Sequence, residues 1–372
     1  MTASLFFAAL SFVWPFLGAV LVAMTGKAQN RRLSLWAAGI ACLLSVVVFL
    51  NPGTVASGWD DDPVQRAGRV MLAFGLLMTV LEQKSFQTRL LRSLPYVSVG
   101  LADLACITPE PVVGLGLLGL SLVYGVFVIG HAAGKAMVGW RILRSMAVGL
   151  FLVLAGLLLP PGKTEAGIML ACGSIVLAGL VPFSMIWAEN VDLAFFRPFV
   201  GAVILLSLHF RAAGGDAFHT TLIIAGLVSL WFTAVSTRGD DKWYRFYSFP
   251  LALAFIAVGA RADVAALLFL CGWCLAGGSE MAKYAWAARA LACQPPGAPF
   301  VGCLLLFSVL SDMSWMLTIL TIGGILGVIL RVFPKNSGDL SFWPHDSAGR
   351  VACVVLVATG FMVPLAMMLG VF

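Results

Sequence analysis

Charge is scarce in this sequence. Charged residues make up only 11% of the 372 residues, whereas 61% are hydrophobic. Typical soluble domains carry about 25% charged residues. A chain of this composition cannot cover a globular surface with polar groups, so a soluble protein is excluded and lipid is the expected solvent.

Motifs of soluble catalysis are also missing. There is no Gly-x-Gly-x-x-Gly loop, no P-loop and no zinc-ligand spacing. The four histidines, His131, His209, His219 and His345, are too dispersed for a haem or metal site. The net charge of +6 is modest and indicates loop orientation rather than binding to nucleic acid. We therefore expect no catalytic site of the chain's own, no cofactor, no metal and no nucleic-acid partner.

The eight cysteines form no framework along the chain. Cys271 and Cys274 have the spacing of a thiol redox motif, but they lie inside an apolar run with no βαβ pattern around it. A thiol in such a run behaves as a small hydrophobe. The sequence therefore predicts packing rather than redox chemistry for this pair.

Long apolar runs dominate what is present. A helix needs about 20 apolar residues to cross the hydrocarbon core, and all of its backbone polar groups find partners within the segment. No strand-like alternation appears, so we predict an all-α polytopic membrane protein with about 12–14 transmembrane helices. The expected spans are 3–25, 33–51, 66–82, 94–108, 111–131, 142–160, 166–187, 196–212, 219–236, 246–261, 264–287, 300–332 and 350–371.

Two of these runs have unusual lengths. The run at 94–108 is short and weak. The run at 300–332 is too long for one upright helix at about 1.5 Å per residue. It is predicted to be strongly tilted, broken, or divided into two short spans.

The charges of successive loops alternate in sign. Lys27 and Arg32 follow the first run, Asp60 the second, Lys84 the third and Glu110 the fourth. Lysine and arginine accumulate on the cytoplasmic side, which predicts a multi-pass inner-membrane protein with its N-terminus outside. The first run has no basic segment before it and no small-residue cleavage site, so we expect a retained span rather than a signal peptide.

A first distinctive segment contains Pro182, Phe183 and Trp187, followed by Glu189 and Asp192. A proline inside a helix removes a backbone hydrogen bond and clashes with the preceding turn. Broken helices of this kind mark ion or substrate sites in transporters, although a plain packing kink gives the same pattern.

Two further segments add to this pattern. The first contains Asp241, Lys242, Tyr247 and Ser248 in a charged loop that runs into the next span. The other is a proline-rich stretch that ends in Pro299 and Phe300 at the start of the long run. A second Pro-Phe step in the other half of the chain is the pattern of paired, interrupted segments in inverted repeats.

The order and spacing of these three segments resemble the antiporter-like membrane subunits of respiratory complex I, with relatives in membrane-bound hydrogenases and multisubunit sodium/proton antiporters. The resemblance covers about residues 110–332, although Ser184 stands where that family has a histidine. It implies two inverted helix repeats, each with a broken helix interrupted at its Pro-Phe step. The expected organisation is N-terminal helices at 1–109, an antiporter-like core at 110–332, and a loop and helix at 333–372. The implied partners are other membrane subunits of a multisubunit complex, together with membrane lipids.

The chain departs from this family at the ionisable positions. The resemblance implies a glutamate on the fifth helix, but the run at 111–131 contains no carboxylate. Leu177 stands where the family has a lysine, and no lysine follows Pro299 until Lys335. Only His209 falls near one of the family's ionisable positions.

Ionisable groups in the membrane interior cost at least about 2.5–3.5 kcal/mol, so they mark function or specific pairing. The proton-relay candidates are His209, Glu280, Lys283 and Asp312, with Glu189 and Asp192 near the entrance. Each has a structural alternative. Glu280 and Lys283 are spaced to form a helical ion pair, whereas His209 and a buried, mid-helix Asp312 would hydrogen-bond to neighbouring groups. Asp103 lies closer to a span end, where contact with water is expected.

Three functions remain open at this point. The first is a membrane-arm subunit that couples redox chemistry in partner subunits to movement of protons or sodium ions. The second is a degenerate antiporter-like subunit with a structural role and no ion conduction. The third is a membrane enzyme acting on a lipid-linked substrate, for which Asp60, Asp61 and Asp62 are the acidic candidates. A solvated outer loop that obeys the charge asymmetry is the better explanation of these three residues.

Overall fold

The computed structural model describes the chain in segments. These segments comprise residues 3–25, 30–51, 62–82, 88–132, 134–180, 182, 193–235, 242–276, 293, 295, 297–332 and 347–368. All regular elements within these ranges are α-helices, which confirms the all-α prediction. Eight of them are long and apolar enough to cross a membrane, and six are shorter apolar helices. The protein is therefore a multi-pass membrane protein.

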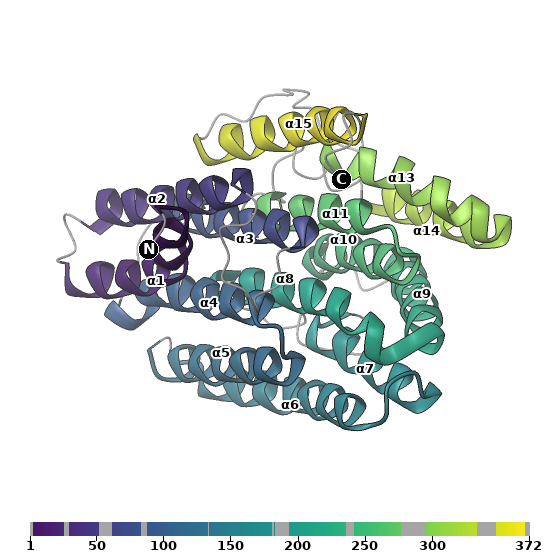
Figure 1. Cartoon of the computed structure of the whole chain (residues 1–372), viewed down its shortest axis with the longest axis horizontal. Coiled ribbons are helices and arrows are strands. Elements are labelled where there is room, and N and C mark those ends of the chain that lie inside the picture. Colours follow the sequence, from purple (N-terminus) through teal and green to yellow (C-terminus); the bar gives the residue numbers. More distant parts are fainter. Residues whose placement is uncertain are drawn as a thin grey trace.

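The helices follow one another with short connections in much of the chain (Figure 1). In order they are α1 (Ala3–Met24), α2 (Asn30–Leu50), α3 (Pro63–Glu82), α4 (Arg89–Ile107), α5 (Pro111–Ala132), α6 (Ala136–Leu158), α7 (Thr164–Leu177), α8 (Leu193–His209), α9 (Arg211–Val235), α10 (Lys242–Gly259), α11 (Asp263–Ala276), α13 (Ala298–Met313), α14 (Trp315–Val332) and α15 (Ser347–Met368).

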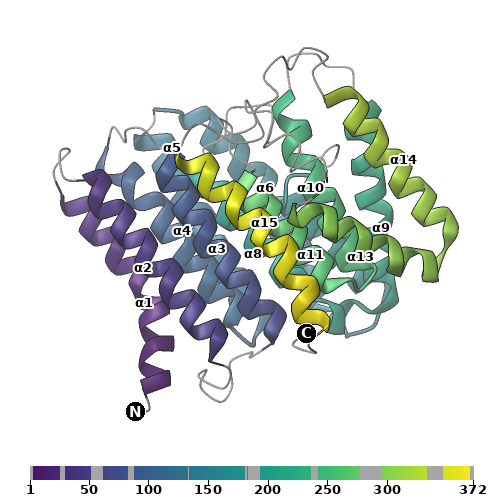
Figure 2. The same ribbon diagram turned by 90° about the horizontal axis from the view of Figure 1, so that it is seen from above.

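Helices α8, α10 and α11 form the centre of the bundle (Figure 1). In α8, the side chains of 195–207 are all buried, which is expected of a helix that is apolar on every side. Helices α1 and α2 form one edge, whereas α9 and α14 lie at the opposite edge (Figure 2). Peripheral helices such as α6 and α15 keep only 28% and 22% of their apolar windows buried inside the chain. Their outward faces therefore remain available to lipid or to other subunits.

The long run at 300–332 divides into two helices. Ser314 separates α13 from α14 and has extended backbone angles, φ −168° and ψ 125°. The predicted break in this run is thus confirmed, whereas a separate membrane crossing by each of the two helices stays a prediction. Pro299 lies in the first turn of α13, two residues after the N-cap residue Gly297, so the Pro-Phe step begins this helix. Proline is tolerated in a first helical turn because its missing N–H has no partner there in any case. Because 277–292, 294 and 296 lie outside the described residues, an interruption of a preceding helix at this step stays a prediction.

The break predicted at the first Pro-Phe step, Pro182–Phe183, lies close to an observed helix end. Helix α7 ends at Leu177, five residues before Pro182, which lies in an exposed turn. The predicted short length of the span at 94–108 is wrong, because α4 begins at Arg89 and has 19 residues, enough for a full crossing. The span is weakly apolar as predicted, with a mean hydropathy of 1.4. The Pro95 within it lies near the helix start. The two inverted repeats and the three-part organisation remain predictions.

Candidate functional site: buried ion pairs between the helices

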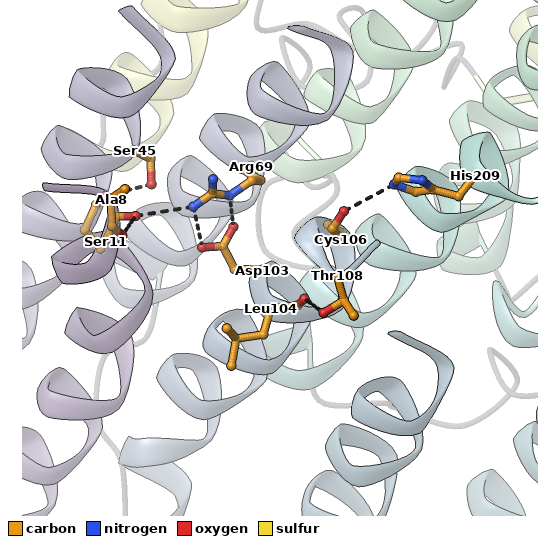
Figure 3. Close-up of polar contacts among 10 residues, drawn as sticks. Ala8, Ser11, Ser45, Arg69, Asp103, Leu104, Cys106, Thr108 and His209 are labelled. Atoms are coloured by element: carbon orange, nitrogen blue, oxygen red, sulfur yellow. Dashed lines mark hydrogen bonds and ion pairs between the residues drawn. The ribbon is translucent and has the colours of Figure 1, made fainter. Parts of the chain in front are cut away.

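A buried ion pair joins α3 to α4. Nε of Arg69 lies 2.6 Å from Oδ1 of Asp103, and Nη2 of Arg69 lies 3.0 Å from Oδ2 (Figure 3). The two side chains are 3% and 7% exposed. The two-pronged geometry matches a planar guanidinium to a carboxylate, which is the strongest form of charge-assisted hydrogen bond.

Two residues of α1 also contact Arg69 of this pair. The Nη2 group of Arg69 also donates to Oγ of Ser11 at 3.3 Å, and its guanidinium carbon lies 4.4 Å from the ring centre of Phe12. A cation over an aromatic face gains further attraction when it is desolvated. Arg69 therefore holds three helices together within a region that is otherwise apolar.

His209 lies close to this ion pair along α4. It is the last residue of α8, is half-buried, and its Nε2 lies 3.2 Å from the carbonyl oxygen of Cys106 (Figure 3). Cys106 follows Asp103 by one helical turn. Nearby, Nε2 of Gln65 donates to the carbonyl of Leu205 at 2.9 Å, which fixes α8 to α3. The contact between His209 and Cys106 agrees with the structural alternative to a proton relay, in which His209 forms a hydrogen bond to a neighbouring group.

A more exposed pair follows directly after His209. Arg211, at the start of α9, binds Asp263, at the start of α11, with Nη1 2.9 Å from Oδ2 and a second contact between Nη2 and Oδ1. These side chains are 21% and 32% exposed, so this pair contacts solvent more than the pair of Arg69 does. It fixes the start of the edge helix α9 against the start of the central helix α11.

A second buried pair lies at the opposite end of α3. Both carboxylate oxygens of Glu82 lie 3.2 Å from Nη2 of Arg197 on α8. Nη1 of Arg197 donates to Oγ1 of Thr79 at 2.8 Å and to the carbonyl of Gly75 at 3.4 Å. The side chains of Arg197 and Glu82 are 1% and 12% exposed. Arg69 and Glu82 are about 20 Å apart along α3, at about 1.5 Å per residue, so charge binds α3 both within its N-terminal half and at its C-terminal end.

Such pairs are suited to holding helices rather than to passing protons. A guanidinium stays protonated in proteins and cannot release a proton. A carboxylate held by two contacts to a guanidinium has its oxygens occupied as hydrogen-bond acceptors. Removing one partner of a buried pair is strongly destabilising, because the other charge is left without compensation.

Several predicted site residues lie outside the described residues. These are Phe183, Trp187, Glu189, Asp192, Asp241, Glu280 and Lys283. Lys242 and Tyr247 belong to the first turns of α10. Of the remaining motif residues, Ser248 and Pro299 are buried, whereas Pro182 is exposed. The roles predicted for the residues outside the described ranges remain predictions.

The expectation for Asp312 is wrong. It was predicted to be buried in the middle of a helix, but it is the penultimate residue of α13 and is exposed. The break at Ser314 places it at a helix end. The expectation for Asp103 is also wrong, since this residue is only 5% exposed rather than in contact with water.

Sequence reasoning missed Arg69 and Glu82 altogether and did not pair Asp103 or Arg197 with a partner. One signal was available: Arg69 is a charge well inside an apolar run, where ionisable groups are expensive unless paired. The partner of Arg69 could not be predicted from the sequence, because Arg69 and Asp103 belong to different helices.

The predicted packing of the cysteine pair is confirmed. Cys271 and Cys274 are fully buried in α11. No metal-binding cluster of histidine, cysteine or acidic residues occurs in the described part of the chain.

Known structures resemble this arrangement over nearly the whole chain. One is a chain of respiratory complex I from Thermus thermophilus with bound Aureothin, with 17% sequence identity, a TM-score of 0.76, and coverage of 96% of this chain and 98% of that one. The chain has the fold of a respiratory-complex membrane subunit. A chain of the membrane-bound sulfane sulfur reductase, an archaeal respiratory membrane complex, has 11% identity and a TM-score of 0.71, with coverage of 96% and 95%.

This respiratory-subunit fold was not evident from overall sequence similarity. No family model matches the sequence, and no curated protein matches it. The resemblance drawn from the Pro-Phe steps and the Asp-Lys loop is thus confirmed at the level of the fold. Since the identities are low, the likeness describes the path of the chain and leaves the side-chain chemistry to be argued from this protein's own residues.

Proposed function

We propose that this protein is a membrane-arm subunit of a multisubunit respiratory complex in the inner membrane, with its N-terminus outside. The observation that carries the proposal is the fold match, which spans 96% of this chain and 98% of the complex I chain. In this protein, the outward faces of α6 and α15 are apolar, which is consistent with contacts to other membrane subunits and to lipids.

Within such an arm, we propose that its role is structural rather than ion-conducting. The carboxylates of buried Asp103 and half-buried Glu82 are each bound by two contacts to an arginine. Leu177, where the resembled family has a lysine, is only 1% exposed and ends α7. Helix α5 carries no carboxylate at all. These features favour a subunit that keeps the fold while lacking much of the family's relay.

Coupling of redox chemistry to proton or sodium translocation is the second candidate. Half-buried His209 supports it, because its ring contacts the backbone carbonyl of Cys106, which lies one turn along α4 from the buried carboxylate of Asp103. The relay would use His209, Glu280, Lys283 and Asp312, with Glu189 and Asp192 near its entrance. An enzyme acting on lipid-linked substrates gains no support: Oδ1 of Asp62 accepts a hydrogen bond from the backbone N–H of Val64, as a helix-capping residue does.

Purification of the tagged chain in mild detergent tests the assembly proposal. We expect other membrane subunits and redox subunits to co-elute, and we expect deletion of the chain to break up that complex. A chain that elutes alone from its native membrane, with the remaining respiratory complexes intact after deletion, would contradict the proposal.

Ion transport by vesicles separates the two roles. A structural role predicts unchanged ion movement by an assembled complex that carries Glu280→Gln, Asp312→Asn or His209→Gln. Reduced ion movement with normal subunit content would favour the relay instead.

A further inference from the structure

Helix α2 lies with α1 at one edge of the bundle (Figure 2). A shallow, open groove runs along the outward side of α2. The opposite side of α2 is packed: Ala37 and Ala38 are buried, and Tyr96 donates to the carbonyl of Ser34 at 2.6 Å. The groove therefore belongs to the side of the helix that no other described helix covers. Its lining residues are Arg32, Leu35, Trp36, Gly39, Ile40 and Leu43.

The shape of the groove comes from one glycine between two large side chains. A Cβ atom added at Gly39 would meet nothing within 4 Å, so the position is open. Trp36 and Leu43, which are 72% and 63% exposed, lie on either side of it. The groove has a volume of about 460 Å³ and is open to the outside along its length rather than enclosed.

The charge of the groove is confined to one end. Arg32 is exposed at the start of α2, beside exposed Arg31, and the rest of the lining is apolar. Arg32 forms no ion pair within the described part of the chain. The surface therefore needs an occupant with an anionic head and an apolar body.

The length of the groove identifies the class of occupant. From Arg32 to Leu43 the helix rises about 16 Å at about 1.5 Å per residue, which is about half of the roughly 30 Å hydrocarbon core. An apolar groove that starts at a cationic residue and ends near the middle of the bilayer matches one leaflet. We propose that this groove binds one anionic phospholipid, with its phosphate at Arg32 and an acyl chain lying over Gly39 between Trp36 and Leu43.

Photo-labelling tests this site on the full chain. The purified protein is reconstituted into vesicles that contain, at equal mole fraction, either phosphatidylglycerol or phosphatidylcholine with a diazirine on the acyl chain, and the labelled peptides are mapped by mass spectrometry. We expect phosphatidylglycerol to label the 32–43 peptide more strongly than phosphatidylcholine does. Raising the salt concentration should reduce this preference, because an exposed charge is screened.

Two variants locate the head and the chain of the lipid. Arg32→Gln should lower phosphatidylglycerol labelling about fivefold, the expected attraction of one basic residue near a membrane surface. Gly39→Leu should abolish labelling by filling the open position, without a clash inside the chain. The matched controls are Gly116→Leu, at another open glycine on α5, and Arg144→Gln, at an exposed arginine on α6; neither should change labelling.

Two outcomes would overturn the proposal. Equal labelling by both lipids, unaffected by Arg32→Gln and Gly39→Leu, would mean ordinary bulk lipid at this face. Loss of labelling in the assembled complex, together with cross-links from this face to a partner subunit, would mean that the groove is a protein interface. Neither result bears on whether the chain co-purifies with a respiratory complex, so the two proposals fail independently.

Discussion

Nε of Arg69 lies 2.6 Å from Oδ1 of Asp103, and neither side chain is more than 7% exposed. The two residues come from neighbouring antiparallel helices, α3 and α4, and Ser11 and Phe12 of α1 complete their surroundings. This is a neutral unit inside an apolar bundle. The Arg69–Asp103 pair specifies how α1, α3 and α4 pack against one another, so its removal should lower the stability of the bundle.

Asp103→Asn should lower the free energy of unfolding by about 3–5 kcal/mol, because Arg69 would keep a buried charge without a counter-ion. Denaturant unfolding of the protein in mixed micelles measures this change. The double variant Arg69→Met with Asp103→Leu should lose much less, because it removes both charges. Arg261→Gln is the control: its ion pair with Asp216 is exposed, so little change is expected. Equal losses in the single and double variants would contradict a role as a pair.

Arg197→Lys should destabilise the bundle although it conserves the charge. A lysine cannot reproduce the fork that reaches Glu82, Thr79 and the carbonyl of Gly75 together. We expect a loss of about 1–3 kcal/mol, the usual cost of leaving a buried polar group unsatisfied. Thermal unfolding in detergent measures it. A variant as stable as the wild type would show that only the charge of Arg197 matters.

Gly167→Ala should be poorly tolerated. A Cβ atom at this position would lie 2.3 Å from the carbonyl oxygen of Gly214 and 2.7 Å from the backbone nitrogen of Phe218, so α7 and α9 would have to separate. Overpacking of this kind costs about 1–3 kcal/mol. Gly116→Ala is the control on α5, where a Cβ atom meets nothing within 4 Å. It should be neutral or slightly stabilising, since alanine is the better helix former; a similar loss in both variants would contradict the packing argument.

His209→Phe should cost about 1 kcal/mol through the lost hydrogen bond to Cys106. Under the proposed structural role, it should leave ion movement by the assembled complex unchanged. Melting temperature and proton uptake by vesicles are the two measurements. His131→Phe is the matched control, because His131 is exposed and stacks on Phe127. Reduced proton uptake with normal assembly, in the His209 variant only, would assign His209 to a relay.

The class of this protein could be predicted from local sequence. The length of an apolar run decides whether a helix crosses a membrane, and that property needs no knowledge of neighbours. The Pro-Phe steps and the Asp-Lys loop were likewise enough to indicate the fold that the comparison with complex I confirms. The second Pro-Phe step begins α13, and an interruption of the helix before it stays a prediction because those residues lie outside the described ranges. The extended backbone at Ser314, which breaks the long run, has no comparable mark in the sequence.

The sequence by itself determined that the chain is helical and immersed in lipid, because composition and run length fix the solvent that each segment tolerates. Only the tertiary structure decided which charges neutralise each other. Arg69 and Asp103 are 34 residues apart, and Glu82 and Arg197 are 115 apart. A charge inside an apolar run predicts an ion pair, because an unpaired buried charge is costly. The identity of its partner depends on helix packing, which brings together residues that no local pattern connects.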